Sequence, residues 1–442
     1  MLKKVFIKTF GCQMNVYDSN RILDTVKKIG FTETKNLNES DCFILNTCHI
    51  REKATDKVYH EVGRVKKEFR HRKKPIVLIV GCVAQAEGDI LLQKEKYIDS
   101  VVGPQSYHEI NKIILDIENS NARINSTEFE VIEKFDQLNL VKNSNSKISS
   151  FLTIQEGCDK FCKFCVVPYT RGPEYSRSYL EIISEAKQLV DNGSQEIILL
   201  GQNVNAYNFK NKRLSDLLYS LSEIKNLERI RYTTSHPKDF TDDLIEIHGE
   251  CKKLMPLLHL PVQSGSTKIL KSMSRNHTIE EYLEIIEKLQ KKNSSIKFSS
   301  DFIIAYPGET KDDFEKTVSL MKQVEFINSY SFIFSPRPGT VAENLDLIEK
   351  KISIERLEKI QNILFENQIQ MNKSLEDKVI DVLVENLTDD KSKAFGRSEY
   401  MTSVIFNGKK CDIGKIVQVR VNDSNRNTLF GEIITNSDQK VA

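Results

Sequence analysis

The sequence predicts an α/β protein of three parts: an N-terminal open parallel sheet with helices on its faces, a central partial (β/α)6 barrel of the TIM type, and a small C-terminal antiparallel β-barrel. Short apolar strands alternate with helical patterns over most of the chain, an order typical of parallel sheets. The last part instead alternates apolar and polar residues between turn signals. The expected boundaries are residues 2–118, a polar linker at 119–147, the central barrel at 148–374 and the small barrel at 377–441.

Composition limits the classes of protein to consider. The chain has 442 residues, of which 39% are hydrophobic and 29% charged, as in soluble proteins of several domains. No apolar run approaches the length of a membrane span. Nine cysteines without disulfide-type spacing indicate a reducing, cytoplasmic location.

Charge gives one local signal. The net charge of +2 does not by itself indicate nucleic-acid binding, but residues 64–74 hold seven basic residues against the single acid Glu68. This run fits contact with phosphates and the solvated end of a helix equally well.

In the N-terminal part, apolar strands are expected at 5–9, 43–47 and 77–81, with helices at 19–29 and 51–69. Their order predicts an open parallel sheet.

A cysteine follows each of these three strands: Cys12, Cys48 and Cys82. The carboxyl ends of parallel strands share one edge of the sheet, where ligands bind. The three thiols are therefore expected to meet there as a metal site, although three small buried residues are the alternative. The other cysteines show no partnered spacing and are expected only to pack: Cys42, Cys251 and Cys411.

The central part repeats the alternation in longer units. A TIM-type barrel of six βα units places its chemistry on the loops that follow the strands. The expected strands are 151–155, 196–200, 229–233, 257–261, 298–304 and 330–334, with helices at 179–191, 279–292, 312–324 and 354–375.

The loop after the first of these strands reads GCDKFCKFC, with thiols at Cys158, Cys162 and Cys165. This C-x3-C-x2-C spacing lets one short loop bind three irons of a 4Fe–4S cubane and leaves the fourth iron for a non-protein ligand. Such an open iron predicts chelation and reductive cleavage of S-adenosylmethionine (SAM). Structural zinc is the alternative, but it prefers four ligands in paired hooks. Phe161 and Phe164 fit a dry cluster pocket, and Phe164 is expected to contact the cofactor.

Later barrel loops carry polar tips that suit SAM or substrate: Gln202, Asn203, Ser235, His236, Gln263, Ser264 and residues 306–310. Turn or capping chemistry is the alternative, as Thr278 and Thr310 illustrate by standing before expected helices.

The C-terminal strands are expected in VIDVLVENL, SVIFNG, GKIVQVRVNDS and LFGEII. Compact β-barrels of this size often bind RNA, and a folding or dimerising module is the alternative.

Several segments together resemble the radical-SAM methylthiotransferase family: NTCHIREKATDKVYHEVGR, EGCDKFCKFCVVPYTRGPEYSR, LGQNVNAY, HLPVQSGS, DFIIAYPGET, FIFSPRPGT and GRSEYMTSVIF. The first two are most similar to the branch that acts on tRNA. Two residues depart from the family's pattern. His49 stands where a small residue is expected, and Ala305 where glycine is usual.

This resemblance implies a SAM-cleaving cluster on Cys158, Cys162 and Cys165, an auxiliary 4Fe–4S cluster on the other three aligned cysteines, and a C-terminal TRAM domain. It implies methylthiolation of carbon 2 of isopentenylated adenosine 37 in a tRNA anticodon stem-loop. One SAM would supply the methyl group and a second the radical. A low-potential electron donor such as flavodoxin or ferredoxin is implied, and the chain is expected to be a cytoplasmic monomer. Other possibilities are a methylthiotransferase for threonylcarbamoyl-adenosine tRNA or for a ribosomal protein, and a non-catalytic iron–sulfur or RNA-binding protein.

Overall fold

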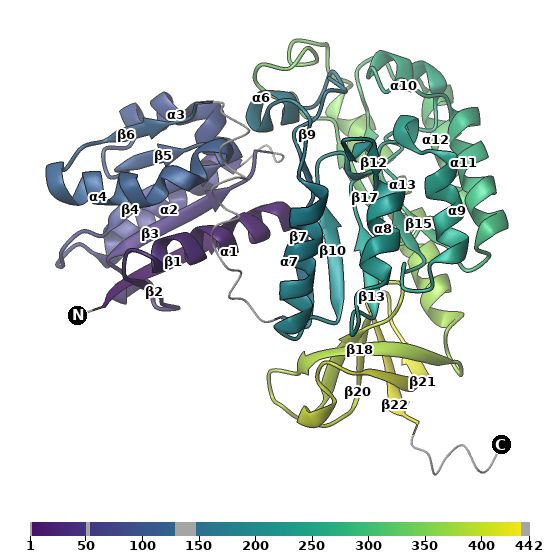
Figure 1. The fold of residues 1–442 in the computed structure, drawn as a ribbon. Helices are drawn as coiled ribbons and strands as arrows, with labels where there is room; N and C mark the ends of the chain where they lie inside the picture. The colour runs from purple at the N-terminus through teal and green to yellow at the C-terminus, as the bar shows by residue number, and fades with distance from the viewer. Residues whose placement is uncertain (1, 50–53, 129–146, 435–442) are drawn as a thin grey trace.

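The computed structural model describes residues 2–49, 54–128 and 147–434. Its three parts are an N-terminal sheet domain, a central barrel beside it, and a small barrel at one end of the central barrel (Figure 1). The predicted fold class is confirmed.

The N-terminal domain is a six-stranded, fully parallel sheet in the order β2-β1-β3-β4-β5-β6. Helices α1 and α4 pack on one face, and α2 and α3 on the other. The bounds are β1 Lys3–Thr9, α1 Gln13–Lys27, β2 Phe31–Glu33, β3 Cys42–Thr47, α2 Ala54–Glu68, β4 Ile76–Gly81, α3 Cys82–Lys94, β5 Ser100–Val102, α4 Ile110–Ser120 and β6 Ile124–Ser126.

Two boundaries differ from expectation. Helix α1 begins at Gln13 rather than residue 19 because its first turns bury polar side chains such as Asn15 and Asp18, which hide the apolar periodicity. The sheet also extends past residue 118, because β6 pairs with β5 inside the segment expected to be linker. The rest of that segment, 129–146, lies outside the described residues.

The central barrel is an open arc of parallel strands in chain order. Strands β7, β10 and β13 form one sheet, and the pairs β14–β15 and β16–β17 continue it. Bridges at Ile230–Leu254 and Gln263–Phe302 join these pieces. No pairing within the described ranges closes β17 onto β7. The strands are β7 Ser149–Thr153, β10 Glu196–Leu200, β13 Arg229–Tyr232, β14 Leu257–His259, β15 Lys297–Ser299, β16 Asp301–Ile304 and β17 Tyr330–Ile333.

Helices surround the arc and bury the molecule's largest apolar core against it. Thr278 and Thr310 cap α11 and α12 through capping boxes with Glu281 and Asp313, as expected. The helices are α6 Val167–Arg171, α7 Tyr179–Asp191, α8 Leu214–Ser222, α9 Asp242–Glu250, α10 Thr267–Ser272, α11 Ile279–Lys292, α12 Lys311–Val324 and α13 Lys350–Lys373, with short strands β8 Gln155–Glu156, β9 Tyr175–Ser176, β11 Asn208–Phe209 and β12 Lys212–Arg213.

The C-terminal part is a closed five-stranded barrel in the order β18-β19-β20-β22-β21. The expected antiparallel pairing holds except between β20 and β22, which are parallel. Strand β19 was not expected, because it is only four residues long. The strands are β18 Val379–Leu387, β19 Ala394–Arg397, β20 Ser403–Asn407, β21 Ile416–Ser424 and β22 Thr428–Ile433.

Two buried arginines dock this barrel onto the central one. Arg229 donates to the carbonyls of Arg397 and Asp381, both at 2.8 Å. Arg231 donates to the carbonyls of Ser398 and Glu399. Both arginines lie on β13, and Arg229 is its first residue. The C-terminal barrel therefore sits at the amino ends of the central strands, opposite the loops that follow their carboxyl ends (Figure 1).

Candidate active site

The structure places Cys12, Cys48 and Cys82 at the carboxyl ends of three neighbouring strands, as expected. Cys12 is the N-cap of α1 just after β1, Cys48 follows β3 directly, and Cys82 is the first residue of α3 after β4. Because β3 lies between β1 and β4 in the sheet, the three thiols occupy one edge.

Two of these thiols lie in close contact. A Cβ added to Gly11, whose φ is +119°, would lie 2.4 Å from Cys48 Cβ, so only glycine allows the two strand ends to approach. A hydrogen bond with Cys48 lowers the pKa of the Cys12 thiol to about 6 against the opposing effect of burial, and the positive charge of Arg171 contributes.

Asn15 ties the strand ends together. Its Nδ2 donates to the carbonyls of Phe10 and Thr47 at 2.8 and 2.9 Å, and its Oδ1 lies 3.7 Å from Cys12 Sγ. One buried amide thus fixes the backbone before both Cys12 and Cys48.

The C-x3-C-x2-C loop is equally constrained. The Cys158 amide donates to Gly172 O at 3.1 Å, and a Cβ on Gly157 would lie 1.8 Å from Pro173 O. Burial raises the pKa of Cys158 to about 12 and that of Cys165 to about 11. Coordination to iron would deprotonate such thiols.

Cysteine thiolates bind either a zinc ion or the irons of an iron–sulfur cluster. A tetrahedral zinc with bonds of about 2.3 Å needs its thiolates within about 4 Å of one another. No group of three or more Cys, His, Asp or Glu side chains in the described part of the chain meets the geometry for one metal ion. In a cubane each thiolate binds a different iron, which requires wider spacing.

The two cysteine sets belong to elements that touch. Helix α6, which follows the C-x3-C-x2-C loop, packs against α3, the helix that begins at Cys82, and α1 packs against β7. The edge of the N-terminal sheet therefore faces the end of the central barrel that carries the C-x3-C-x2-C loop (Figure 1).

The expected cofactor residues have mixed outcomes. Gln202 accepts from the Gly157 amide at 2.7 Å and also bonds Met14 Sδ, so its side chain supports the cluster loop. Asn203 donates to Glu174 and Asp239, while its Oδ1 is buried without a partner. Phe164 packs on the apolar group around Tyr306.

Phe161, expected beside the cluster, is 56% exposed and has a φ of +46°.

Three loops at the carboxyl ends of successive strands hold a non-glycine residue in the left-handed region. These are Thr234 after β13 at +69°, Gln263 after β14 at +76° and Ala305 after β16 at +58°. Such strain concentrates at ligand sites. The glycine usual at position 305 is explained by this backbone conformation, which alanine here adopts at a cost.

Several polar atoms on loops of the central barrel are buried without a hydrogen-bond partner in the described part of the chain. They suit a polar cofactor such as SAM, which would supply the missing partners. The atoms are Asn203 Oδ1, Ser235 Oγ, His236 Nε2, Arg275 Nε, His277 Nε2 and Glu309 Oε1.

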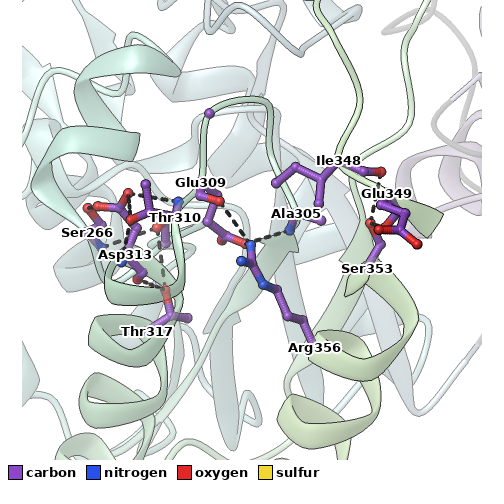
Figure 2. A network of polar contacts seen from close by, with 12 residues as sticks. Ser266, Ala305, Glu309, Thr310, Asp313, Thr317, Ile348, Glu349, Ser353 and Arg356 are labelled. Atoms are coloured by element: carbon purple, nitrogen blue, oxygen red, sulfur yellow. Dashed lines mark hydrogen bonds and ion pairs between the residues drawn. The ribbon is translucent and has the colours of Figure 1, made fainter. Parts of the chain in front are cut away.

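A buried ion pair between Glu309 and Arg356 supports the loop at 305–310. Figure 2 shows Glu309 between Ala305 and Arg356. Glu309 Oε2 accepts from the Ala305 amide at 3.0 Å and from Arg356 Nη1 at 2.6 Å. Burial raises the pKa of this carboxyl despite the guanidinium.

Relatives of known name match the chain along its whole length. A tRNA-2-methylthio-N(6)-dimethylallyladenosine synthase from Pelagibacter ubique (strain HTCC1062) is 64% identical, covering 100% of both chains. The chain belongs to the tRNA-2-methylthio-N(6)-dimethylallyladenosine synthase family. A member of the same family from Rickettsia akari (strain Hartford) is 48% identical over 98% of this chain and 100% of its own.

Family profiles divide this synthase-family chain as the structure does. Residues 4–103 match the Uncharacterized protein family UPF0004, 152–321 the Radical SAM superfamily and 373–434 the TRAM domain. Among solved structures, the radical S-adenosylmethionine methyltransferase TsrM from Kitasatospora setae shares the fold. It has a TM-score of 0.59 and 11% identity, with 77% of this chain and 75% of that chain covered.

Sequence reasoning missed several residues of this synthase-family site. Gln155 Oε1 accepts from the amides of both Gln202 and Asn203, and its Nε2 donates to Gly157 O. Arg275 Nη1 lies 3.7 Å from Cys162 Sγ. A glutamine ending an apolar strand was the available signal for Gln155, whereas nothing local marks Arg275.

The basic run at 64–74 lies away from the cysteines. Helix α2 has 15 residues and leads from the cysteine edge back to the start of β4, so its basic end is about 22 Å distant. Three of its charges pair within the domain: Arg64 with Glu61, Lys66 with Glu95 and Lys74 with Asp99. A solvated helix end is the better interpretation.

No helix within the described residues combines the length and apolarity needed to cross a membrane.

Proposed function

We propose that this chain replaces the hydrogen on carbon 2 of N(6)-isopentenyladenosine 37 of tRNA with a methylthio group. One observation carries the proposal: two sets of three cysteines lie on contacting elements, one at the edge of the parallel sheet and one on the first barrel loop. The relatives named above support tRNA as substrate.

Each cysteine set would hold one 4Fe–4S cluster. Cys158, Cys162 and Cys165 fit the cluster that binds SAM, because backbone hydrogen bonds fix the loop that carries them. Cys12, Cys48 and Cys82 fit the auxiliary cluster. When bound, these groups supply the reductive cleavage of SAM and the sulfur for transfer.

The chain's own residues bind and orient the reactants. The unpartnered atoms of Asn203, Ser235, His236 and Glu309 offer both donors and acceptors to the polar groups of SAM. The contact between α3 and α6 holds the two sites together, and a target base must leave its stack to enter between them.

The TRAM barrel supplies the RNA-binding surface. Because it sits at the amino ends of the central strands, a tRNA held there must extend along the barrel to reach the cysteines, a distance of about 15 Å or more. The anticodon stem-loop suits that span. A low-potential donor such as flavodoxin or ferredoxin would supply the electron, and the chain would act as a monomer in the cytoplasm, where its substrate is.

The test is anaerobic incubation of reconstituted chain with reductant, SAM and isopentenylated tRNA, followed by mass spectrometry of the nucleosides. We expect 2-methylthio-N(6)-isopentenyladenosine and 5′-deoxyadenosine. Product only with threonylcarbamoyl-adenosine tRNA, or only with a ribosomal protein, would assign another substrate. Absence of 5′-deoxyadenosine would refute the proposed radical reaction.

A further inference from the structure

Arg171 is a buried guanidinium shared by both cysteine sites. It is 2% exposed and ends α6. Its Nη1 donates to Glu156 Oε1 at 2.6 Å, and its Nη2 donates to Asp18 Oδ2 at 2.9 Å and to Asn15 Oδ1 at 3.1 Å. One side chain thus joins the barrel to α1.

On the barrel side, these bonds reach the base of the C-x3-C-x2-C loop. Glu156 lies two residues before Cys158 in the chain. Gly172, which follows Arg171, accepts the Cys158 amide at 3.1 Å. Any shift of Arg171 must therefore move the loop that carries the first thiol.

On the other side, the bonds reach the edge of the N-terminal sheet. Asn15, which Arg171 contacts, holds the carbonyls before Cys12 and Cys48. Gln105 Nε2 donates to Arg171 O at 2.7 Å and adds a third segment of that domain. The guanidinium also acts electrostatically on the Cys12 and Cys82 thiols.

Arg177 also joins the two domains and serves as the comparison for Arg171. It is equally buried, pairs with Glu185 at 2.8 Å, and reaches Tyr17 on the same helix α1 at 3.4 Å. Within the described part of the chain, its bonds to Glu185, Tyr17 and the Thr153 carbonyl reach no residue of either cysteine loop. Arg177 therefore joins the two domains without touching the cysteine loops, whereas Arg171 joins the domains and also contacts these loops.

We propose that Arg171 is a positioning residue that fixes how the two cysteine sites face each other and places a permanent positive charge beside the Cys12/Cys48/Cys82 site. This inference rests on the proposed function only where its test measures activity. Lysine cannot reproduce the role, because a single ammonium lacks the planar fork that bonds Glu156, Asp18 and Asn15 together.

The test compares Arg171→Lys and Arg171→Gln with Arg177→Lys and Arg177→Gln in the full chain, reconstituted anaerobically. The first readout is 5′-deoxyadenosine formed per methylthio product. Misplacement of one site by a fraction of an ångström should uncouple radical formation from transfer, so Arg171→Lys should raise this ratio about tenfold. The Arg177 variants should change it less than about twofold.

Two readouts do not depend on turnover. In a background lacking Cys158, Cys162 and Cys165, removal of the charge by Arg171→Gln should move the midpoint potential of the remaining cluster to more negative values. In the chain without clusters, Arg171→Lys should speed amide exchange at 13–18 and 157–172 together. Arg177 variants should leave the potential unchanged.

An unchanged product ratio in Arg171→Lys, or equal shifts in the Arg171 and Arg177 variants, would overturn the inference. Arg171→Gln removes the positive charge that two buried carboxylates face and so destabilises the fold, but Arg171→Lys keeps the charge and decides the positional role. If the wild-type chain cleaved SAM without modifying tRNA, the proposed function would be refuted. The midpoint potential and the amide-exchange rates would still test the role of Arg171.

Discussion

At the scale of single residues, removal of one thiol should impair a different step of the reaction in each cysteine set. Cys158→Ala should abolish SAM cleavage, because that loop would bind the cluster that reduces SAM. Cys48→Ala should still release 5′-deoxyadenosine but attach no methylthio group. Iron content should fall from about eight to about four per chain in either variant. Full product formation by Cys48→Ala would contradict the auxiliary role.

The Glu309–Arg356 pair allows a stability prediction with a matched control. Arg356→Gln leaves a carboxylate buried and unpaired, which should lower the free energy of unfolding by about 3 kcal/mol. Lys359→Gln, one turn away on α13, breaks an exposed pair with Glu315 and should cost less than about 1 kcal/mol. Urea unfolding of both variants measures the difference.

The loss in Arg356→Gln should depend on pH. Burial raises the pKa of Glu309, and removal of the guanidinium raises it further. The folded variant then binds a proton more readily than its unfolded chain, so lowering the pH through that raised pKa stabilises it relative to wild type. A difference that grows toward acid pH would contradict this assignment.

Single residues also show where sequence reasoning reaches its limit. The six cysteines were identifiable because their spacing is local, or follows from predicted strand ends. Arg171, Asn15 and Gln155 were not, because their roles depend on partners that only the packing of two domains brings together. Gln202 was expected at the cofactor for its place on a barrel loop, whereas its bond to the Gly157 amide became visible only in the structure.

At the scale of elements, the long apolar strands and amphipathic helices were predictable from periodicity. The strands missed include β2, β5 and β6, each three residues long, and the four-residue β19. Such short strands carry too few positions for alternation to appear. The early start of α1 was hidden because its first turns bury polar groups in the network around Asn15.

Helix α2 and its basic end give an element-scale prediction. Charge reversal at Lys67, Arg70 and Lys73 should change the Kd for tRNA less than about threefold, because this end points away from the cysteine edge. Reversal of Lys410 and Lys415 on the TRAM barrel should weaken binding about tenfold or more and reduce its salt dependence. Binding titrations at two salt concentrations distinguish the two surfaces. A strong loss from the α2 variant would restore the phosphate-binding interpretation.

At the scale of the whole molecule, the cysteine sites and the TRAM barrel lie at opposite ends of the central strands. Under the proposed function a tRNA engages both at once, which requires a fixed distance between them. Arg229 and Arg231 fix it by donating to four carbonyls of the TRAM barrel. Burial lowers the pKa of Arg229, as expected for a cation whose partners are carbonyls instead of a carboxylate.

Arg229→Gln tests this docking without leaving a carboxylate unpaired. The loss of two charge-assisted bonds should weaken docking by about 2 kcal/mol, which raises the undocked fraction about thirtyfold. Amide exchange at Ala394–Arg397 and the KM for tRNA should both rise, whereas SAM cleavage without tRNA should not change, because the radical-forming site lies at the other end of the strands. Arg213→Gln, which breaks an exposed pair with Asp243, is the control and should alter neither. Faster exchange with an unchanged KM would show that the tRNA does not depend on a fixed TRAM barrel.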